Sequence, residues 1–367
     1  MKSILMRPES AVIFCDVFPP DIGGISSTAS RVASYLTIRG TPPTVICVKE
    51  DFIRTIHGKM EFKNKTQDIL TSFDRHTEYT EQFMNILPEK ITPAFIVSFY
   101  MGRCSYLAYK FNRLLKVRHS IVCVGSDIYQ HFERYSVKWR YHKMIKWCSR
   151  IGLLSESMSP YFIKYPEAGE KLMYLPFGFD HHLFTPMVAE KQYDFIFVGR
   201  SKPVKGLDIF LEALLKVKKS CRVCLVIPKF AADKDFFNKC FSFAQRKLGR
   251  HKIKWLPEQT HSELAILYNA SRCLVMPSRS EASPHVILEA MSCNIQVIAS
   301  NVGRVIEMLG TKECIYNTCE ELVCLLNTYI DNKFDNKPCY RKRVLEITDP
   351  DREMRAYRNF VGLQDQP

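Results

Sequence analysis

Long apolar runs are missing from this sequence of 367 residues, although 46% of its residues are hydrophobic. No run approaches the roughly 20 apolar residues that a membrane-spanning helix needs, and residues 1–8 are too short for a signal peptide. Repeats and low-complexity segments are missing too, and charged residues make up 25%, as in globular proteins. We therefore expect a cytoplasmic protein that is long enough for two domains, each with its own core.

Motifs of metal-binding and nucleic-acid-binding proteins are also missing. The chain has no zinc-finger spacing and no ribonucleoprotein motif of basic and aromatic residues. Cys221 and Cys224 have the spacing of half a zinc site, but they fall in an expected strand, where residues three apart point to opposite faces. No second pair with this spacing follows. We expect no metal, no other cofactor and no nucleic-acid partner.

Acidic residues are scarce relative to basic ones, since 38 Asp and Glu stand against 52 Lys and Arg, which gives a net charge of +14. Such a charge attracts nucleic acid, acidic lipid surfaces or phosphorylated substrates. Residues 136–150 contain five Lys and Arg, two tryptophans and no acid. This composition suits a helix on an anionic membrane surface, which would place the protein peripherally on the cytoplasmic face. The alternative is a helix packed on the core with a solvated basic face.

Short apolar runs alternate with segments of helical period along most of the chain. They predict strands at residues 11–17, 44–48, 94–99, 120–124, 193–198, 223–227 and 273–276. This alternation is typical of a parallel, doubly wound sheet, so the fold class is α/β. Proline, glycine and histidine near residues 176–182 favour a domain boundary, which we place after residue 185. The second domain would then cover 186–349, and a C-terminal helix at about 350–367 would pack back on the first.

Two glutamates separated by seven residues, Glu281 and Glu289, follow the apolar run at 273–276. A helix is expected to begin between them, because Ser is a favoured N-cap and Pro suits the first helical position. Its start comprises Ser283, Pro284, His285 and Val286. Backbone N–H groups there would face an anion such as a phosphate. A carboxylate beside a phosphate needs another function, such as accepting hydrogen bonds from sugar hydroxyls; the alternative is two solvated glutamates.

Two further loops follow expected strands and carry groups suited to phosphate. Gly199 and Arg200 end the strand at 193–198, and Lys205 follows shortly after. Fixed cations at the carboxyl end of a sheet neutralise a diphosphate, although this is not a P-loop because the lysine precedes its glycine. Gly23 and Gly24 follow the first strand, where glycine allows close approach of a ligand or simply makes a tight turn.

These segments together resemble the retaining GT-B glycosyltransferases of family four. The resemblance is carried by Glu281-x7-Glu289 with Ala290-Met291, by 297–303 with Glu307, and by Gly199-Arg200 with Lys205-Gly206. It covers nearly the whole chain and implies two Rossmann-like domains facing each other across a cleft, with a nucleotide-sugar donor held mainly by the second domain. In the family the second glutamate, here Glu289, binds the donor ribose, and the first, here Glu281, lies against the transferred sugar.

The resemblance also implies a reaction. A sugar would pass from the nucleotide-sugar donor to a hydroxyl of a glycan, a glycolipid or another polysaccharide precursor, with retention of configuration and without a metal. Arg200 and Lys205 would hold the leaving diphosphate, and the loop of Gly23 and Gly24 would lie over the donor phosphates and the acceptor pocket.

The sequence departs from the family at three places. Val124 stands where the family often carries histidine or arginine, so no catalytic histidine is assigned. Asp127 matches the aspartate of the same motif and is an acceptor-side candidate, or else it caps the next helix. Pro228 replaces a glycine-rich turn, and Asn294 replaces the glycine that usually follows the second-glutamate helix. Asparagine tolerates the left-handed conformation that glycine would supply.

Two other functions fit these features. Sugar-nucleotide epimerases share the architecture but release an isomerised sugar nucleotide without an acceptor. A non-catalytic polyanion-binding protein would account for the net charge of +14.

Overall fold

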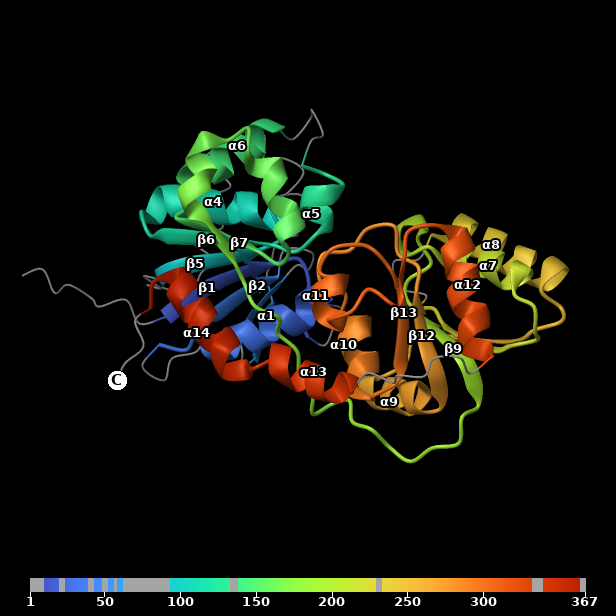
Figure 1. Cartoon of the computed structure of the whole chain (residues 1–367). Coiled ribbons are helices and arrows are strands. Elements are labelled where there is room, and N and C mark those ends of the chain that lie inside the picture. The colour runs from blue at the N-terminus through green and yellow to red at the C-terminus, as the bar shows by residue number, and fades with distance from the viewer. Residues whose placement is uncertain are drawn as a thin grey trace, which may run out of the picture. The chain divides into compact units, whose positions relative to one another are not determined.

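The computed structural model describes residues 10–19, 24–38, 43–47, 52–55, 58–61, 93–132, 138–228, 233–331 and 339–363. The chain divides into two compact units, residues 1–178 with 350–367 and residues 179–349. Each unit is built on one β-sheet (Figure 1). The boundary thus lies at Gly178 instead of residue 185, and the last helix belongs to the first unit.

The first unit contains an eight-stranded sheet in the order β4-β3-β2-β1-β5-β6-β7-β8. The strands are β1 Ser10–Cys15, β2 Thr44–Cys47, β3 Phe52–Thr55, β4 Gly58–Glu61, β5 Pro93–Phe99, β6 Arg118–Cys123, β7 Arg150–Leu153 and β8 Leu172–Tyr174. Strands β2, β1 and β5 to β8 are parallel, as the alternating pattern predicts. Strands β3 and β4 pair antiparallel at one edge, which the pattern did not indicate.

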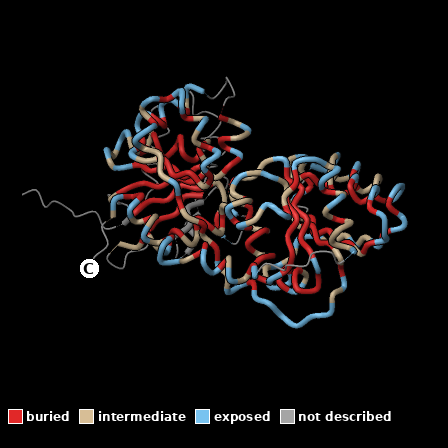
Figure 2. The backbone as a smooth tube through the Cα atoms, viewed as in Figure 1, coloured by how far each residue is buried: buried red, intermediate tan, exposed pale blue. Residues whose placement is uncertain are grey.

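Helices cover both faces of this sheet (Figure 1). They are α1 Gly24–Tyr35, α4 Arg103–Leu115, α5 Ser126–Tyr129, α6 Lys138–Trp147 and α14 Pro350–Val361, with 3-10 helices at Glu156–Phe162 and Pro166–Lys171. Alternate residues of β1 pack against α1 and α14, and the strands are the most completely buried part of the unit (Figure 2).

A buried ion pair joins α14 to α1. The guanidinium of Arg31 donates two hydrogen bonds to the Glu353 carboxylate, at 2.6 and 2.9 Å, and the Tyr35 hydroxyl donates a third at 2.9 Å. A Cβ atom at Gly178 would collide with both charged side chains, so the chain passes directly over the pair as it leaves the unit. These contacts explain why the C-terminal helix belongs to the first unit.

The second unit contains a six-stranded sheet in the order β11-β10-β9-β12-β13-β14, and every pair in it is parallel. The strands are β9 Tyr193–Val198, β10 Arg222–Val226, β11 Lys252–Leu256, β12 Ser271–Met276, β13 Gln296–Ser300 and β14 Ile315–Tyr316. Numbered along the chain this order is 3-2-1-4-5-6, the Rossmann order, whose ligands bind where the strand order reverses, between the first and fourth strands. That point lies between β9 and β12.

Helices also cover both faces of the second sheet (Figure 1). They are α7 Leu207–Lys216, α8 Lys234–Lys247, α9 His261–Asn269, α10 His285–Ser292, α11 Val305–Leu309, α12 Cys319–Ile330 and α13 Tyr340–Ile347, with a 3-10 turn at Pro203–Lys205. The core on one face joins β9, β10 and β12 to α7, α8 and α12. Two Rossmann-like α/β domains, as expected from the sequence, are therefore confirmed.

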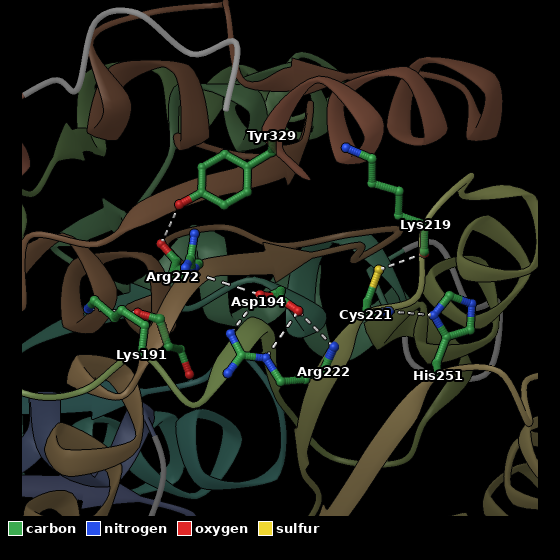
Figure 3. A network of polar contacts seen from close by, with 9 residues as sticks. Lys191, Asp194, Lys219, Cys221, Arg222, His251, Arg272 and Tyr329 are labelled. Carbon is green, nitrogen blue, oxygen red and sulfur yellow. Dashed lines mark hydrogen bonds and ion pairs between the residues drawn. The ribbon is translucent and has the colours of Figure 1, made fainter. Parts of the chain in front are cut away.

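The amino ends of the second sheet carry a polar network (Figure 3). The Asp194 carboxylate accepts hydrogen bonds from the backbone N–H and the guanidinium of Arg222, at 2.8 and 3.1 Å, and lies 3.8 Å from Nε of Arg272. The ammonium group of Lys191 donates to two backbone carbonyls. These cations are thus used to hold strands together at the end of the sheet opposite to the switch point.

A capping box begins α9. The Thr260 hydroxyl accepts a hydrogen bond from the Glu263 N–H at 3.2 Å, while the Glu263 carboxylate accepts one from the Thr260 N–H at 2.8 Å. Because an N-cap hydroxyl satisfies an otherwise unpaired N–H group, Thr260→Ala is expected to lower the free energy of unfolding by about 1 kcal/mol. Urea denaturation of both proteins measures this difference. Thr260→Ser keeps the hydroxyl and serves as the control; equal losses in the two variants would contradict the cap.

Candidate functional site

The loops after β9 and β12 meet at the switch point of the second sheet. Lys205 Nζ lies 2.5 Å from Glu281 Oε1, and the Ser278 hydroxyl donates to the same oxygen at 2.9 Å. The side chains of Lys205 and Glu281 are 25% and 14% exposed, so the ion pair is shielded but still reached by solvent. The structure therefore brings together two of the residues that the sequence selected, and it adds Ser278.

Backbone packing fixes the two loops against each other. Gly206 has φ 69° and Gly303 has φ 55°, values that residues with a Cβ atom rarely adopt. A Cβ atom at Gly206 would collide with the carbonyl oxygen of Pro277, and one at Gly303 would collide with the carbonyl oxygens of Glu281 and Ala282. Both positions therefore need glycine, and both set where the Lys205 and Glu281 loops lie.

Arg279 joins the same loops and was not selected from the sequence. Its guanidinium forms a bidentate ion pair with Asp208, at 2.7 and 2.8 Å, and its backbone N–H donates to the carbonyl of Val204 at 2.8 Å. The Asp208 bond raises the pKa of Arg279. This arginine thus serves the loop structure, and no motif in the sequence distinguished it from a solvent-exposed residue.

Gly199 and Arg200 stand at the carboxyl end of β9, as expected. The N–H of Gly199 donates to the carbonyl of Val226 at 3.1 Å, which ties the start of the loop to β10. The Arg200 side chain is exposed and, within the described part of the chain, has no ion-pair partner. Its guanidinium is therefore available to an anionic ligand at this edge of the sheet.

The helix that carries the second glutamate begins later than expected. Helix α10 starts at His285, and its N-cap is Pro284 with φ −74° and ψ 110°; Ser283 lies outside the helix and does not cap it. The expectation of a Ser283 cap was wrong because Pro284 itself is extended, so the first turn starts one residue after it. Val286 and His285 form that first turn, and the His285 ring lies edge-on to Phe179 at 6.1 Å.

Glu289 lies about one turn into α10 and is half-buried. The hydroxyl of Tyr268, on α9, donates to Glu289 Oε2 at 2.7 Å. Burial raises the pKa of Glu289 to about 7, because desolvation penalises the charged form, and the Tyr268 hydrogen bond acts in the opposite direction. Glu289 is therefore not an ordinary solvated helix glutamate. After the helix, Asn294 has φ 54°, which confirms the left-handed conformation expected there.

Asp127 is buried in the first unit, and its carboxylate holds two loops. It accepts hydrogen bonds from the backbone N–H groups of Met101, Val124 and Gly125, at 2.8, 3.1 and 2.7 Å. Burial raises its pKa, and these three hydrogen bonds oppose the shift. Two of the donors precede α5 and the third follows β5, so Asp127 joins the loops after β5 and β6 instead of capping the helix.

Tyr100 was not selected from the sequence, yet it has an unusual backbone at the carboxyl end of β5. Its φ is 76°, a left-handed value that costs a bulky residue roughly 1–3 kcal/mol. Its carbonyl accepts hydrogen bonds from the Gly102 N–H at 2.7 Å and the Ser105 hydroxyl at 2.8 Å, which hold the conformation. No sequence signal marks this residue, because tyrosine rarely adopts such a backbone.

The glycine pair after β1 is only partly described. Gly23 lies outside the described residues. Gly24 is the first residue of α1, and a Cβ atom there would meet nothing within 4 Å. Packing among the described residues therefore gives no reason for a glycine at this position.

The basic segment at 136–150 forms α6 from Lys138 onward. Tyr141, Met144 and Ile145 are buried, whereas Trp139 and Trp147 are 43% and 46% exposed. The Arg113 guanidinium lies 3.7 Å from the centre of the Trp147 ring, and Lys143 Nζ lies 4.9 Å from the centre of the Trp139 ring. One face of α6 thus packs on the unit, and the other exposes basic and indole groups together.

Metal ligands and membrane spans are not found in the described ranges. No cluster of three or more His, Cys, Asp or Glu side chains there is placed to hold a metal ion. None of the helices there is both long enough and apolar enough to cross a bilayer.

Known proteins resemble this chain in sequence. Residues 182–341 match the family described as glycosyl transferases group 1. A probable sucrose-phosphate synthase of Thermosipho melanesiensis is 23% identical over 344 residues, which covers 85% of this chain and 79% of that protein. A D-inositol 3-phosphate glycosyltransferase of Segniliparus rotundus is 32% identical over 109 residues, 29% of this chain, and the match spans only 24% of that protein.

Solved structures resemble it in fold. The Anabaena protein HepE in complex with UDP-glucose superposes with a TM-score of 0.75 over 96% of this chain and 100% of that one, at 15% identity. Sucrose-phosphate synthase from Thermosynechococcus elongatus superposes with a TM-score of 0.74 over 98% and 100%, at 16% identity. The fold agrees along nearly the whole chain, and the residues that match the glycosyl transferases group 1 family, 182–341, include the Lys205 and Glu281 site.

Proposed function

We propose that this protein is a glycosyltransferase that moves a sugar from a nucleotide-sugar donor to an acceptor hydroxyl. The observation that carries the proposal is the cluster of Lys205, Glu281 and Ser278 at the switch point of a Rossmann sheet, inside a group 1 glycosyltransferase domain. A nucleotide ligand is expected at that point of such a sheet. The HepE structures contain UDP or UDP-glucose, which supports the same class of ligand here.

Charge decides how the donor would lie. A diphosphate next to the Glu281 carboxylate would be repelled unless a cation lay between them, and Lys205 is in contact with that carboxylate at 2.5 Å. The lysine therefore faces the diphosphate while Glu281 accepts hydrogen bonds from the transferred sugar. Arg200 and the backbone N–H groups at the start of α10 add positive potential for the leaving group. Glu289 binds the ribose.

The proposed transfer retains configuration and needs no metal and no other cofactor. Lys205 and Arg200 supply the positive charge that a metal would otherwise supply to the departing diphosphate. No protein nucleophile is assigned, because the acceptor is proposed to react on the front face of the sugar, and no catalytic histidine is assigned, because Val124 stands where the family often has histidine or arginine. The leaving phosphate takes the proton of the acceptor hydroxyl on the same face. The acceptor is a glycan, a glycolipid or another polysaccharide precursor.

Product analysis tests this function. A thermal-shift panel of nucleotide sugars first selects the donor, because a ligand that binds only the folded state raises the melting temperature. The donor is then incubated with and without glycan and lipid acceptors, and products are identified by NMR, which also reports the anomeric configuration. An isomerised nucleotide sugar without any acceptor would indicate an epimerase. Activity that disappears in EDTA and returns with a divalent metal would contradict the metal-independent step.

The exposed face of α6 further suggests a cytoplasmic protein that lies on an acidic membrane surface. We expect sedimentation with vesicles that contain anionic lipid, and weaker sedimentation at high salt. Changing Lys138, Lys143 and Lys146 together to Glu should weaken binding about a hundredfold or more, since each lysine near such a surface contributes about 1 kcal/mol.

A matched triple variant controls for net charge. Lys218, Lys247 and Lys252 are exposed in the second unit, and changing them to Glu alters the net charge by the same amount. This control variant should leave vesicle binding nearly unchanged. Equal losses in both triple variants, or sedimentation that is independent of anionic lipid, would show that α6 is not a membrane-binding surface.

A further inference from the structure

We propose that Tyr268 is a positioning residue for Glu289, which holds one carboxylate oxygen so that the group stays oriented and charged for the donor ribose. This inference rests on the proposed function, because it assigns a partner to the glutamate that would bind the donor. Tyr268 itself would not touch the donor.

Tyr268 is held in one orientation. Its side chain is 0% exposed in the last turn of α9, and the Phe184 ring lies edge-on to it at 6.0 Å. The next residue, Asn269, is also buried; its side chain donates to the Thr185 carbonyl at 2.9 Å and accepts from the Met187 N–H at 2.7 Å. The end of α9 is therefore fixed to the segment at 184–187, and the phenol reaches Glu289 from a rigid support.

The Tyr268 hydroxyl has one proton, which it donates to one oxygen of the Glu289 carboxylate. Tyr268 donates to Glu289 Oε2 at 2.7 Å, a short distance typical of a hydrogen bond to a charged carboxylate. Within the described residues no other group donates to this carboxylate. A free carboxylate has about four acceptor positions, so Oε1 and the second lone pair of Oε2 are available to hydroxyl donors. The ribose offers two such hydroxyls.

The surroundings of Glu289 disfavour its charge. Burial raises the pKa of Glu289 to about 7, and the Tyr268 hydrogen bond lowers it. Among the described residues, Cys293 at the end of α10 is a further titratable neighbour, whose own pKa is raised first by burial and then by the Glu289 charge. The cations of Arg341, on α13, and Lys191 act on Cys293. Without the phenol a larger fraction of the carboxyl would therefore be protonated at neutral pH, and this form accepts fewer hydrogen bonds.

Calorimetry of donor binding against pH tests the inference. The probe is UDP-glucose, or whichever nucleotide sugar of the panel stabilises the wild type most. In the wild type, affinity should rise as the pH increases from 6 to 8, since Glu289 must lose its proton. In Tyr268→Phe the midpoint of this pH dependence should move up by about one pH unit, so affinity should fall about fivefold at pH 7 and recover to within about threefold at pH 8.5.

Tyr316→Phe is the matched control. Tyr316 is a buried tyrosine of the same unit whose hydroxyl has no hydrogen-bond partner within the described residues, so its loss should not move the midpoint. If Tyr268→Phe does not fold, incorporation of 3-fluorotyrosine keeps the ring; this more acidic phenol is a stronger donor and should move the midpoint down.

The outcomes separate the two proposals. Failure of the wild type to bind any nucleotide sugar would overturn the proposed function. The role of Tyr268 would be overturned if the wild type binds the donor and Tyr268→Phe has the same pH midpoint of binding. It would also be overturned if Tyr268→Phe loses the same affinity at every pH. Both outcomes would leave the proposed function in place.

Discussion

Lys205→Ala is expected to lower turnover by about ten- to a thousandfold, the range for removal of one fixed group that stabilises charge in the transition state. Lys205 is the cation in direct contact with Glu281, at 2.5 Å, at the switch point of the second sheet. Its loss would leave the departing diphosphate next to an uncompensated carboxylate. Arg200→Ala should fall in the same range, because the exposed guanidinium would bind the same diphosphate. Steady-state kinetics with the selected donor measures both effects.

Controls distinguish catalysis from loop structure. Lys216→Ala removes an exposed lysine of the same unit whose ion pair with Glu320 spans 3.4 Å, and exposed pairs of this kind contribute little to stability. Its turnover should stay near that of the wild type. If Lys205 acted only by holding Glu281 in place, Lys205→Ala would cause no further loss of turnover in a protein that already carries Glu281→Gln. Wild-type turnover in both Lys205→Ala and Arg200→Ala would contradict the assignment.

The proximity of Lys205 and Glu281 was predictable because parallel strands place their carboxyl ends at one edge of a sheet. The sequence predicted strands before each loop, so two residues 76 positions apart in the chain had to share that edge if their strands were neighbours. The order of β9 next to β12 satisfies this condition. The direct ion pair and the contact with Ser278 depend on side-chain geometry, which no spacing rule determines.

Other features depend on tertiary contacts and were missed for that reason. The β3–β4 hairpin lies at a sheet edge and pairs antiparallel, so it does not follow the alternation of strand and helix from which the other strands were predicted. Helix α10 begins after Pro284 because of the local backbone, although Ser283 followed by proline is a favoured start in sequence. The link between Tyr268 and Glu289 joins two helices, and a tyrosine on an apolar helix face is otherwise read as core.

Glu289→Gln is expected to weaken donor binding by about ten- to a hundredfold, because charge-assisted hydrogen bonds contribute roughly 1.5–3 kcal/mol. Gln keeps the shape but replaces part of an acceptor with a donor. A 2′-deoxyribose donor should bind the wild type more weakly than the normal donor, and the variant should lose less on the same change. Calorimetry with both donors on both proteins measures the coupling; additive losses would show that Glu289 does not bind the ribose hydroxyl.

Glu289→Gln should also raise the stability of the folded protein, although it weakens donor binding. In the folded protein the pKa of Glu289 is raised to about 7, above the roughly 4.3 expected of an unfolded chain. The folded state therefore binds the proton more tightly, and this contribution to stability is complete below about pH 4 and is lost as the pH rises through 7. Gln does not titrate, so the melting temperature of Glu289→Gln should exceed that of the wild type by more at pH 8 than at pH 5. An equal difference at both pH values would mean that the carboxyl titrates normally, whereas a larger difference at pH 8 would fit the trade of stability against function that is common at ligand-binding sites.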